Sequence, residues 1–443
     1  MGRQVVVLGA GATGEAFTAA LRRLDENADV TVVEHQLVGG ECSYWACIPS
    51  KTLLRPLEVL SRARLAPGAA GALDGPVDIA AVFDWRDDQA AKDDASHVRW
   101  IERLGATLVR GTATVVEPGL VRADGRELRY DDLFVATGSL AAQPPVAGLA
   151  DLEHWGSRDG TSASSVPESL LVVGGGAVGS ELAQVYARLG ARVTLVQNRH
   201  LLPNLDPEAG DLLAEFLRED GVDVRVGAAA ARVEGGEGGY RLTLANGDEV
   251  EAERLLVATG RKPNVDGLGL DQLDVTVERS GIVVDERLRA GTGVWAAGDV
   301  TGVALFTHVG KYQGRVAAAN VAGYDRRADY RAVPSCVFTD PQVAAVGDTS
   351  GEGVVSASWP LQSVARTGTY QRPKQPGFVK LYADPERRVL VGAIAVGPEA
   401  GEWLGQLTLA VRAEVPVETL RDTIQPFPTF SEAIFFAARD LDV

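Results

Sequence analysis

The sequence has few cysteines and no long hydrophobic segment. Its 443 residues include only three cysteines, too few for the disulfide framework of a small secreted protein. No apolar run approaches the roughly 20 residues that an α-helix needs to span a bilayer. The apolar residues 5–8 lead directly into glycines, and they therefore predict a first β-strand rather than a signal peptide. We expect a cytoplasmic protein without a membrane partner.

Positive charge is also in short supply. The chain carries 43 Lys and Arg residues against 60 Asp and Glu residues, which gives a formal net charge of −17 at pH 7. Because nucleic acids and anionic membranes attract positive surfaces, neither is an expected partner. The length exceeds what one hydrophobic core supports and predicts about two to four domains.

Metal ligands are sparse, although two of the three cysteines lie close together. Four residues separate Cys42 from Cys47, in a stretch that continues into Pro49-Ser50-Lys51. A zinc site would need a further close pair of Cys or His ligands. The remaining candidates are Cys336 and five scattered histidines, so we predict that the protein holds no metal.

The surroundings of Cys42 and Cys47 favour a redox-active pair. Gly39-Gly40 before them and the Pro-Ser-Lys after them indicate a shaped site, and a buried structural pair is the alternative. Cys47 lies at a predicted helix start, where the helix dipole favours the thiolate. Cys336 lies in an apolar strand, where we expect it to pack as a small hydrophobic side chain.

A glycine-rich turn follows the first predicted strand, residues 4–8, with G-x-G-x-x-G spacing at Gly9, Gly11 and Gly14. A helix is predicted to follow from Glu15 to Leu24, and a second strand ends at Glu34, about 20 residues after the last glycine. The glycines allow a pyrophosphate to approach the helix N-terminus, and the acid would accept hydrogen bonds from a ribose diol. This unit predicts a dinucleotide site.

A second unit repeats this pattern after strand 170–173, with glycines at Gly174, Gly176 and Gly179. Its second strand ends at Gln197 instead of an acid, and Arg199 follows. A carboxylate would repel a 2′-phosphate, whereas a neutral Gln beside an Arg accommodates one. We predict NADPH in preference to NADH; the alternative is that Arg199 is only a solvated loop residue.

The remaining pattern completes an α/β fold with two Rossmann-like nucleotide-binding domains and an α+β C-terminal domain. Helices are predicted at 52–64 and 86–104, and a strand at 107–116. Thr137-Gly138 closes the first unit, and Ala258-Thr259-Gly260 closes the second at the corresponding point. A strand ending in Gly298-Asp299 precedes the C-terminal segment, which carries no nucleotide fingerprint.

Taken together in this order, the motifs resemble those of the pyridine nucleotide-disulfide oxidoreductase family, which includes dihydrolipoamide dehydrogenase, glutathione reductase and mercuric reductase. The resemblance covers essentially the whole chain. It rests on the two glycine fingerprints, the C-x4-C-x-P-S-K stretch, Ala258-Thr259-Gly260-Arg261, Gly298-Asp299 and Phe427-Pro428-Thr429-Phe430-Ser431-Glu432.

The resemblance implies three domains and two cofactors. Residues 1–148 and 266–329 would bind FAD, residues 149–265 would bind NAD(P), and residues 330–443 would form the dimerisation domain of a homodimer. The positions that we assign to FAD binding are Gly9, Gly11, Gly14, Glu34, Lys51, Ala113, Thr137, Gly138, Asp299 and His308. Those that we assign to NAD(P) binding are Gly174, Gly176, Gly179, Gln197, Arg199 and Gly260. A structural role is the alternative for His308.

The resemblance also implies catalytic roles for five residues. Cys47 matches the sulfur nearest the flavin, and Cys42 matches the sulfur that exchanges with substrate. Lys51 and Glu181 match an ion pair beside the flavin N5 edge. Glu432 matches the acid of a His–Glu dyad that moves protons during thiol exchange.

The chain departs from the family pattern at that dyad. Phe427 stands where the family has histidine, and no histidine follows His308. Phenylalanine cannot carry a proton, so ordinary dihydrolipoamide or glutathione turnover is not expected. The C-terminus also lacks the cysteine pair of mercuric reductases.

We therefore predict an FAD-dependent NAD(P)H oxidoreductase that reduces a small, non-standard disulfide or oxidises a dithiol through Cys42 and Cys47. One alternative is a reductase that passes electrons from the flavin directly to a quinone or another diffusible acceptor. A second alternative is an inactive FAD-binding scaffold.

Overall fold

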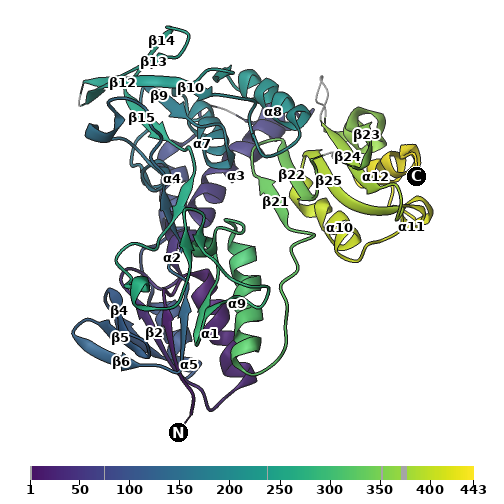
Figure 1. The fold of residues 1–443 in the computed structure, drawn as a ribbon. Coiled ribbons are helices and arrows are strands. Elements are labelled where there is room, and N and C mark those ends of the chain that lie inside the picture. Colours follow the sequence, from purple (N-terminus) through teal and green to yellow (C-terminus); the bar gives the residue numbers. More distant parts are fainter. Residues whose placement is uncertain (1, 74, 237, 351–352, 371–376) are drawn as a thin grey trace. The chain divides into compact units, whose positions relative to one another are not determined.

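The computed structural model describes residues 2–73, 75–236, 238–350, 353–370 and 377–443 (Figure 1). Contacts divide the chain into two compact units. The first combines residues 1–49, 88–142 and 260–329, and the second combines residues 50–87, 143–259 and 330–443. Both mix helices and strands, which confirms the predicted α/β class. The division into three domains stays a prediction.

A six-stranded sheet forms the centre of the first unit. Its strands, in spatial order, are β19 (Arg289–Gly291), β20 (Val294–Ala296), β7 (Asp132–Val135), β1 (Gln4–Leu8), β2 (Asp29–Glu34) and β3 (Thr107–Arg110). β1 runs parallel to both of its neighbours, with Val5 opposite Val30 and Asp132. These strands have near-continuous apolar sequences because parallel strands are buried on both faces.

Smaller strands and helices surround this sheet. The additional strands are β4 (Ala113–Glu117), β5 (Leu120–Ala123), β6 (Arg126–Arg129), β8 (Ser139–Ala141), β16 (Arg261–Pro263), β17 (Val277–Glu278) and β18 (Gly281–Ile282). The helices are α1 (Ala12–Leu24), α2 (Gly40–Tyr44), α5 (Ala95–Arg103) and α9 (Thr307–Val321), with 3₁₀ turns η3 (Leu270–Gln272) and η4 (Asp299–Thr301).

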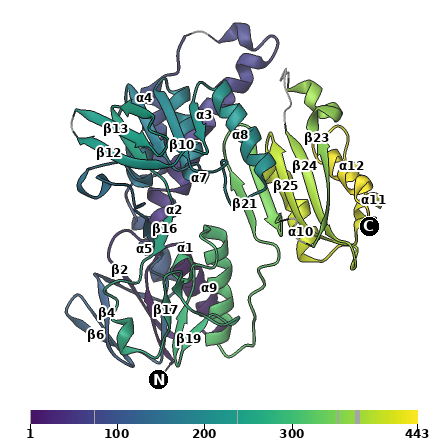
Figure 2. The same cartoon turned by 45° about the horizontal axis from the view of Figure 1, so that its top comes forward.

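Helices α1 and α9 lie side by side in both ribbon views (Figures 1 and 2). Two glycines of α9 make this close approach possible. A side chain at Gly310 would meet the hydroxyl of Thr13, and one at Gly314 would come within 2.8 Å of its carbonyl oxygen. The packing therefore brings the N-terminus of α9 close to the first glycine fingerprint.

The second unit contains the second fingerprint and the C-terminal segment. Its parallel sheet has the order β11 (Asp223–Val226), β10 (Arg192–Gln197), β9 (Ser169–Val173) and β15 (Arg254–Val257). The other elements of this part are β12 (Ala230–Gly236), β13 (Gly239–Leu244), β14 (Glu249–Ala252), α6 (Ser157–Ser162), α7 (Ala177–Arg188), α8 (Pro207–Glu219), η1 (Ala70–Ala72) and η2 (Leu149–Asp151). Helix α3 (Cys47–Leu65) starts in the first unit and continues in the second. Helix α4 (Ile79–Gln89) ends where the chain passes back into the first unit, at Asp88.

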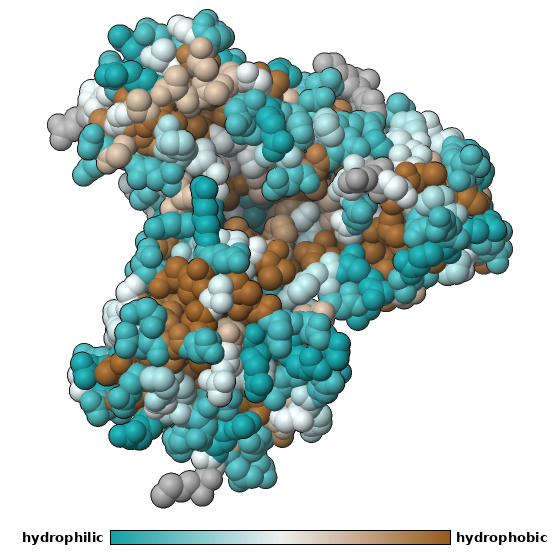
Figure 3. Space-filling model, in the orientation of Figure 1, coloured by the Kyte–Doolittle hydropathy of each residue, from teal (hydrophilic) through white to brown (hydrophobic). Residues whose placement is uncertain are grey.

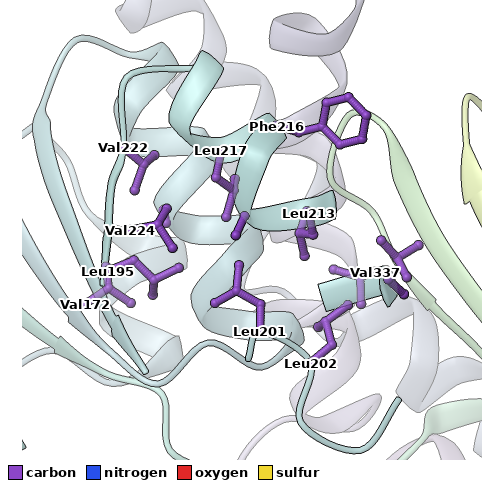
Figure 4. Packing of buried hydrophobic residues seen from close by; sticks show 14 of the residues in the cluster. Val172, Leu195, Leu201, Leu202, Leu213, Phe216, Leu217, Val222, Val224 and Val337 are labelled. Atoms are coloured by element: carbon purple, nitrogen blue, oxygen red, sulfur yellow. The ribbon is translucent and has the colours of Figure 1, made fainter. Parts of the chain in front are cut away.

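One hydrophobic cluster joins the two parts of this second unit. Leu213, Phe216 and Leu217 of α8 pack with residues of the parallel sheet and with Val337 (Figure 4). Asp206 caps α8 by accepting a hydrogen bond from the Glu208 amide, and it also binds Lys380 and Tyr382 in the C-terminal sheet. Burial and polar contacts thus hold α8 against both sheets.

The C-terminal segment is an antiparallel sheet with helices packed against it (Figure 2). The strand order is β21 (Pro334–Val337), β22 (Gln342–Gly347), β25 (Val389–Gly397), β24 (Phe378–Asp384) and β23 (Val355–Pro360). The helices are α10 (Ala400–Arg412), α11 (Val417–Asp422) and α12 (Glu432–Asp440), with η5 (Leu361–Ser363) and η6 (Ala365–Thr369). Figure 3 shows hydrophobic residues at the surface of this part, and Leu409, Ile424 and Phe427 are among the exposed apolar side chains.

Two element predictions were wrong. The predicted helix at 86–104 is two helices, α4 and α5. The acidic residues between them make other contacts: Asp93 accepts a hydrogen bond from the Ala95 amide, and Asp94 accepts one from the distant Val38 amide instead of capping α5. The predicted strand at 107–116 is also two strands, since Gly111 adopts φ +146° and turns the chain. Among the described residues, no helix is both long and apolar enough to cross a membrane.

Candidate functional site

The first glycine fingerprint forms a loop that is open at one position. Gly9 adopts φ +99°, a conformation that side chains rarely allow. A side chain at Gly14 would run into the carbonyl oxygen of Gly9, so this glycine serves helix–strand packing. At Gly11, by contrast, the nearest atom to a β-carbon would be the Gly40 Cα at 3.8 Å. The space in front of Gly11 at the start of α1 fits the approach of a pyrophosphate.

Glu34 holds this loop from the end of β2. It is nearly buried, and its carboxylate accepts hydrogen bonds from the amides of Ala10 at 2.8 Å and Gln36 at 2.7 Å. The remaining lone pairs of a carboxylate suffice for a ribose diol. Its role in cofactor binding stays a prediction.

The second fingerprint reproduces the same geometry with a neutral side chain. Gln197 is nearly buried at the end of β10, and its Oε1 accepts a hydrogen bond from the Gly175 amide at 2.9 Å. A β-carbon at Gly176 would have no atom within 4 Å, whereas one at Gly179 would meet the Gly174 carbonyl. Arg199 donates to the Pro203 carbonyl at 3.4 Å and is exposed.

The remaining predicted FAD positions fall on several elements of the first unit. Asp299 begins η4 and accepts a 2.6 Å hydrogen bond from Ser139. Thr137 donates to the Asn264 carbonyl at 2.7 Å. The side chain of Ala113 is buried in the core, which leaves only its backbone for a ligand. His308 stacks on Phe306. Gly138 takes a positive φ angle of 75°, and so does Gly260, the predicted nucleotide-binding residue at which the chain re-enters the first unit, with 132°.

The cysteine stretch is attached directly to the first glycine loop. The Gly39 amide donates to the Ala10 carbonyl at 2.8 Å, and the chain then turns through two glycines with positive φ into α2. Cys42 lies in α2, and Cys47 is the first residue of α3. This backbone hydrogen bond places the thiols beside the loop that is open at Gly11.

The two thiols interact with each other and with the start of α9. The side chains of Cys42 and Cys47 are hydrogen-bonded, and Cys47 Sγ lies 3.5 Å from Thr307 Oγ1. Thr307 is also hydrogen-bonded to Cys42, and the positive charge of Lys311 interacts with its sulfur. All three cysteines are present as thiols in this structure. The N-termini of α3 and α9 and the Lys311 ammonium therefore supply positive potential around the sulfurs.

The surroundings distinguish the three thiols. The hydrogen bond with Cys47 and burial raise the pKa of the Cys42 thiol well above its ordinary value, although Thr307 and Lys311 partly oppose this. Burial, with a smaller contribution from the Glu181 charge, raises the pKa of Cys336 to about 12. Cys336 is thus an inert packing residue, whereas Cys42 needs a base to become a nucleophile.

Lys51 and Glu181 form the predicted ion pair in the second unit. Lys51 Nζ lies 2.8 Å and 3.0 Å from the two carboxylate oxygens, and only 5% of the Glu181 side chain is exposed. The Phe338 amide donates to the same carboxylate at 2.9 Å, and Lys51 lies 4.8 Å above the Phe338 ring. That this pair lies beside a flavin stays a prediction.

Glu432 starts α12, where its carboxylate accepts a hydrogen bond from the Thr429 amide at 3.2 Å. Phe427, at the position of the expected histidine, has 75% of its surface exposed. Its contact therefore joins the start of α12 to the preceding turn, and the catalytic role of Glu432 stays a prediction.

Four residues of the first unit were missed by the sequence analysis: Thr307 and Lys311, which interact with Cys42, and the hydrogen-bonded pair Glu15 and His97. Thr307 and Lys311 lie one turn apart at the start of α9, after the Gly-Asp motif. Their place beside the cysteines depends on the packing of α1 on α9, which the sequence does not record. His97 Nδ1 lies 2.6 Å from Glu15 Oε1, although 82 residues separate them. No spacing rule in the sequence relates such distant residues.

The fold and this site define a nucleotide-dependent α/β protein with two dinucleotide loops and a thiol pair. The chain belongs to the pyridine nucleotide-disulphide oxidoreductase family, whose model matches residues 3–324 and whose dimerisation-domain model matches residues 333–438. Members of this family are enzymes that use FAD and a pyridine nucleotide. The family resemblance of the motifs is confirmed.

Similar proteins cover almost the whole chain. Dihydrolipoyl dehydrogenase 2 of Haloarcula marismortui is 36% identical over 99% of this chain and 96% of its own length. A mercuric reductase of Acidithiobacillus ferrooxidans is 34% identical over 98% of this chain and 82% of its own length. The crystal structure of LpdA from Mycobacterium tuberculosis is 29% identical, with a TM-score of 0.87 and 99% of both chains covered.

Proposed function

We propose that this enzyme uses NADPH and FAD to reduce a small, non-standard disulfide through Cys42 and Cys47, or to oxidise the corresponding dithiol. The observation that supports this most directly is the hydrogen bond from Gly39 to Ala10, which joins the cysteine stretch to the open glycine loop. A thiol pair held at a dinucleotide loop is suited to exchange electrons with the cofactor bound there.

The residues of the first unit fit FAD. Gly11 leaves space for the pyrophosphate, Glu34 would bind the adenosine ribose, and Asp299 would bind the ribityl chain. When bound, FAD supplies hydride acceptance from the nicotinamide and two-electron transfer to the disulfide. In the second unit, Gln197 leaves the ribose position without a negative charge, which supports NADPH over NADH.

The protein's own groups would then handle charge and protons. Once the pair is reduced, the N-terminus of α3 and the Thr307 hydroxyl stabilise the Cys47 sulfur as a thiolate. Cys42 retains the proton, in agreement with its raised pKa, until it attacks the substrate disulfide. Cys47 then attacks Cys42, which restores the enzyme disulfide and releases the second substrate thiol.

We also propose a homodimer. The C-terminal segment matches a dimerisation domain, and Leu409, Ile424 and Phe427 expose 68%, 95% and 75% of their surfaces. Apolar side chains this exposed favour an interface between copies of the chain.

The variant Cys42→Ser tests the proposed function. We expect it to abolish reduction of a small disulfide and to leave ferricyanide reduction, which draws electrons from the flavin directly, largely unchanged. Unchanged disulfide turnover would contradict the proposal and favour a quinone or other diffusible acceptor. The inactive-scaffold alternative does not fit membership of an enzyme family.

A further inference from the structure

The hydrogen-bonded pair Glu15–His97 lies in the wall of a groove on the first unit. The groove has a volume of about 570 Å³ and lies between α1, α5 and α9. His97 Nδ1 lies 2.6 Å from Glu15 Oε1, and Lys311 lines the same groove. The two side chains are about one-third and one-seventh exposed, so the pair is partly shielded but accessible from the groove.

The other nitrogen of His97 faces the cysteine stretch. A β-carbon at Gly39 would lie 3.1 Å from His97 Nε2 and 3.2 Å from the hydroxyl oxygen of Ser43, the residue after Cys42. The ring therefore borders the space at the start of α2, and the missing side chain at Gly39 leaves its Nε2 edge uncovered. Because an ionised Glu15 orders the Nδ1–H toward itself, Nε2 is free to accept a proton.

Lys311 relates this pair to the sulfurs. Its positive charge lowers the pKa of both the Glu15 carboxylate and the Cys42 thiol, and its side chain lines the groove together with Glu15 and His97. Burial raises the pKa of Glu15 despite the opposing contacts with His97 and Lys311. A partly buried carboxylate attracts a neighbouring imidazolium more strongly than an exposed one, because less water screens the two charges.

We propose that His97 is the acid–base residue for Cys42 and that Glu15 positions it. This pair would then take the role of the histidine that the family pattern has at the position of Phe427. The inference rests on the proposed disulfide chemistry. It assigns proton transfer to a pair within the first unit, where the family pattern places a C-terminal histidine.

His97 Nε2 removes the proton of the Cys42 thiol, and the Cys42 thiolate attacks the substrate disulfide, forming a mixed disulfide and releasing one substrate thiolate. The protonated His97 returns its proton to that thiolate. Cys47 then displaces the second thiolate, which takes a proton from water through His97. The cysteine pair loses two electrons, and the substrate gains them.

Other charged groups line the same groove as His97. They are Arg23 on α1, Arg103 on α5, and Lys311 and Arg315 on α9. The Tyr44 ring lies 6.2 Å from the His97 ring, and its hydroxyl is bound to the Val38 carbonyl. Glu15 is the negative charge in hydrogen-bond contact with the ring, which makes it the decisive partner.

The leaving thiol provides the sharpest test. Bis(2-hydroxyethyl) disulfide releases a basic alkyl thiolate that needs a proton, whereas 5,5′-dithiobis(2-nitrobenzoate) releases a stable thiolate that does not. In the FAD-loaded enzyme with NADPH, we expect His97→Phe to lower kcat for the alkyl disulfide by roughly a hundredfold or more. The aryl disulfide should lose less than about tenfold, since only deprotonation of Cys42 is affected.

Variants and a second readout complete the experiment. Glu15→Gln should weaken the same step and shift its pH profile, and His154→Phe, which removes a histidine of the other unit, serves as the matched control. Ferricyanide reduction reports intact folding and flavin loading. In the reduced protein, the pH profile of Cys42 alkylation by iodoacetamide should lose, in His97→Phe, the contribution of a neutral imidazole that accepts the thiol proton.

Equal losses with both disulfides, or an unchanged alkylation profile, would overturn the role of His97. If His97→Phe and the more conservative His97→Gln both lose ferricyanide activity, the role of His97 can still be tested by the rates of the wild-type enzyme. Its alkyl-to-aryl rate ratio should fall as the pH rises through the imidazole range, and a constant ratio would contradict the inference. Loss of disulfide reduction in Cys42→Ser with normal turnover in His97→Phe would refute this inference alone, whereas full activity of Cys42→Ser would refute the proposed function.

Discussion

Thr307 Oγ1 lies 3.5 Å from Cys47 Sγ, so the first residue of α9 contacts a sulfur at the start of α3. Although 260 residues separate the two in sequence, the close packing of α1 on α9 brings them together. A hydroxyl at this place stabilises the reduced sulfur but has no thiol or thiolate to bind once the disulfide forms.

Replacement of Thr307 by Val should therefore make the cysteine pair harder to reduce. Loss of one hydrogen bond is worth about 1 kcal/mol, which corresponds to a two-electron midpoint potential lower by about 20 mV. The potential is measured by equilibration in thiol buffers followed by alkylation. Thr423→Val, which removes an exposed hydroxyl of the C-terminal segment, is the control; a potential equal to that of this control would show that Thr307 has no such role.

Gln197→Glu should reverse the nucleotide preference. The new carboxylate can keep the hydrogen bond to Gly175, but it stands where the 2′-phosphate of NADPH is expected. Repulsion between like charges should lower the ratio of kcat/KM for NADPH over NADH by roughly tenfold or more. Steady-state kinetics with both nucleotides measure this ratio, with the exposed Gln272→Glu as control. An unchanged ratio would remove the argument for NADPH.

Glu34→Gln should weaken FAD binding. The carboxylate accepts hydrogen bonds from Ala10 and Gln36, and an amide has only one oxygen to serve these donors and a ribose diol. We expect the dissociation constant for FAD to rise roughly tenfold, the effect of about 1.4 kcal/mol. Flavin fluorescence measures it. Gln197→Glu should leave FAD affinity unaltered, and similar losses in both variants would show that the two loops are not specific for their cofactors.

Local loops could be predicted from the sequence, whereas contacts between distant helices could not. Each glycine spacing encodes a local loop, so the open position of Gly11 and the place of Glu34 follow from neighbouring residues. The pairing of His97 with Glu15 depends on how α5 packs on α1, which residue spacing does not record. The helix predicted at 86–104 failed for a related reason, since Asp94 binds the distant Val38 amide instead of continuing the helix.

Acid should weaken the attachment of α8 to the C-terminal sheet. Burial of Asp206 disfavours its ionised form, but hydrogen bonds from Lys380, Tyr382 and the Glu208 amide outweigh this and hold the pKa of Asp206 below its ordinary value of 3.8. Because the folded-state pKa is the lower one, the stabilisation is present above about pH 4 and is lost as the pH falls through the folded-state pKa.

The variant Asp206→Asn keeps a helix-capping side chain and removes the charge. At pH 6 it should be less stable than the wild type by about 1.5–3 kcal/mol, the contribution of a hydrogen bond to a charged group. Thermal melting from pH 6 down to pH 3 should show the gap between the two proteins closing. A gap that is constant or grows with acid would contradict the assignment.

The central claim is that Cys42 and Cys47 form a disulfide that NADPH reduces through FAD. The direct measurement is to denature the FAD-loaded enzyme in iodoacetamide before and after anaerobic addition of NADPH, and to identify the alkylated cysteines by mass spectrometry. Before addition, only Cys336 should be labelled; afterwards, all three cysteines should be. If Cys42 and Cys47 are already labelled in the oxidised enzyme, or stay unlabelled while NADPH bleaches the flavin, the pair is not the redox centre.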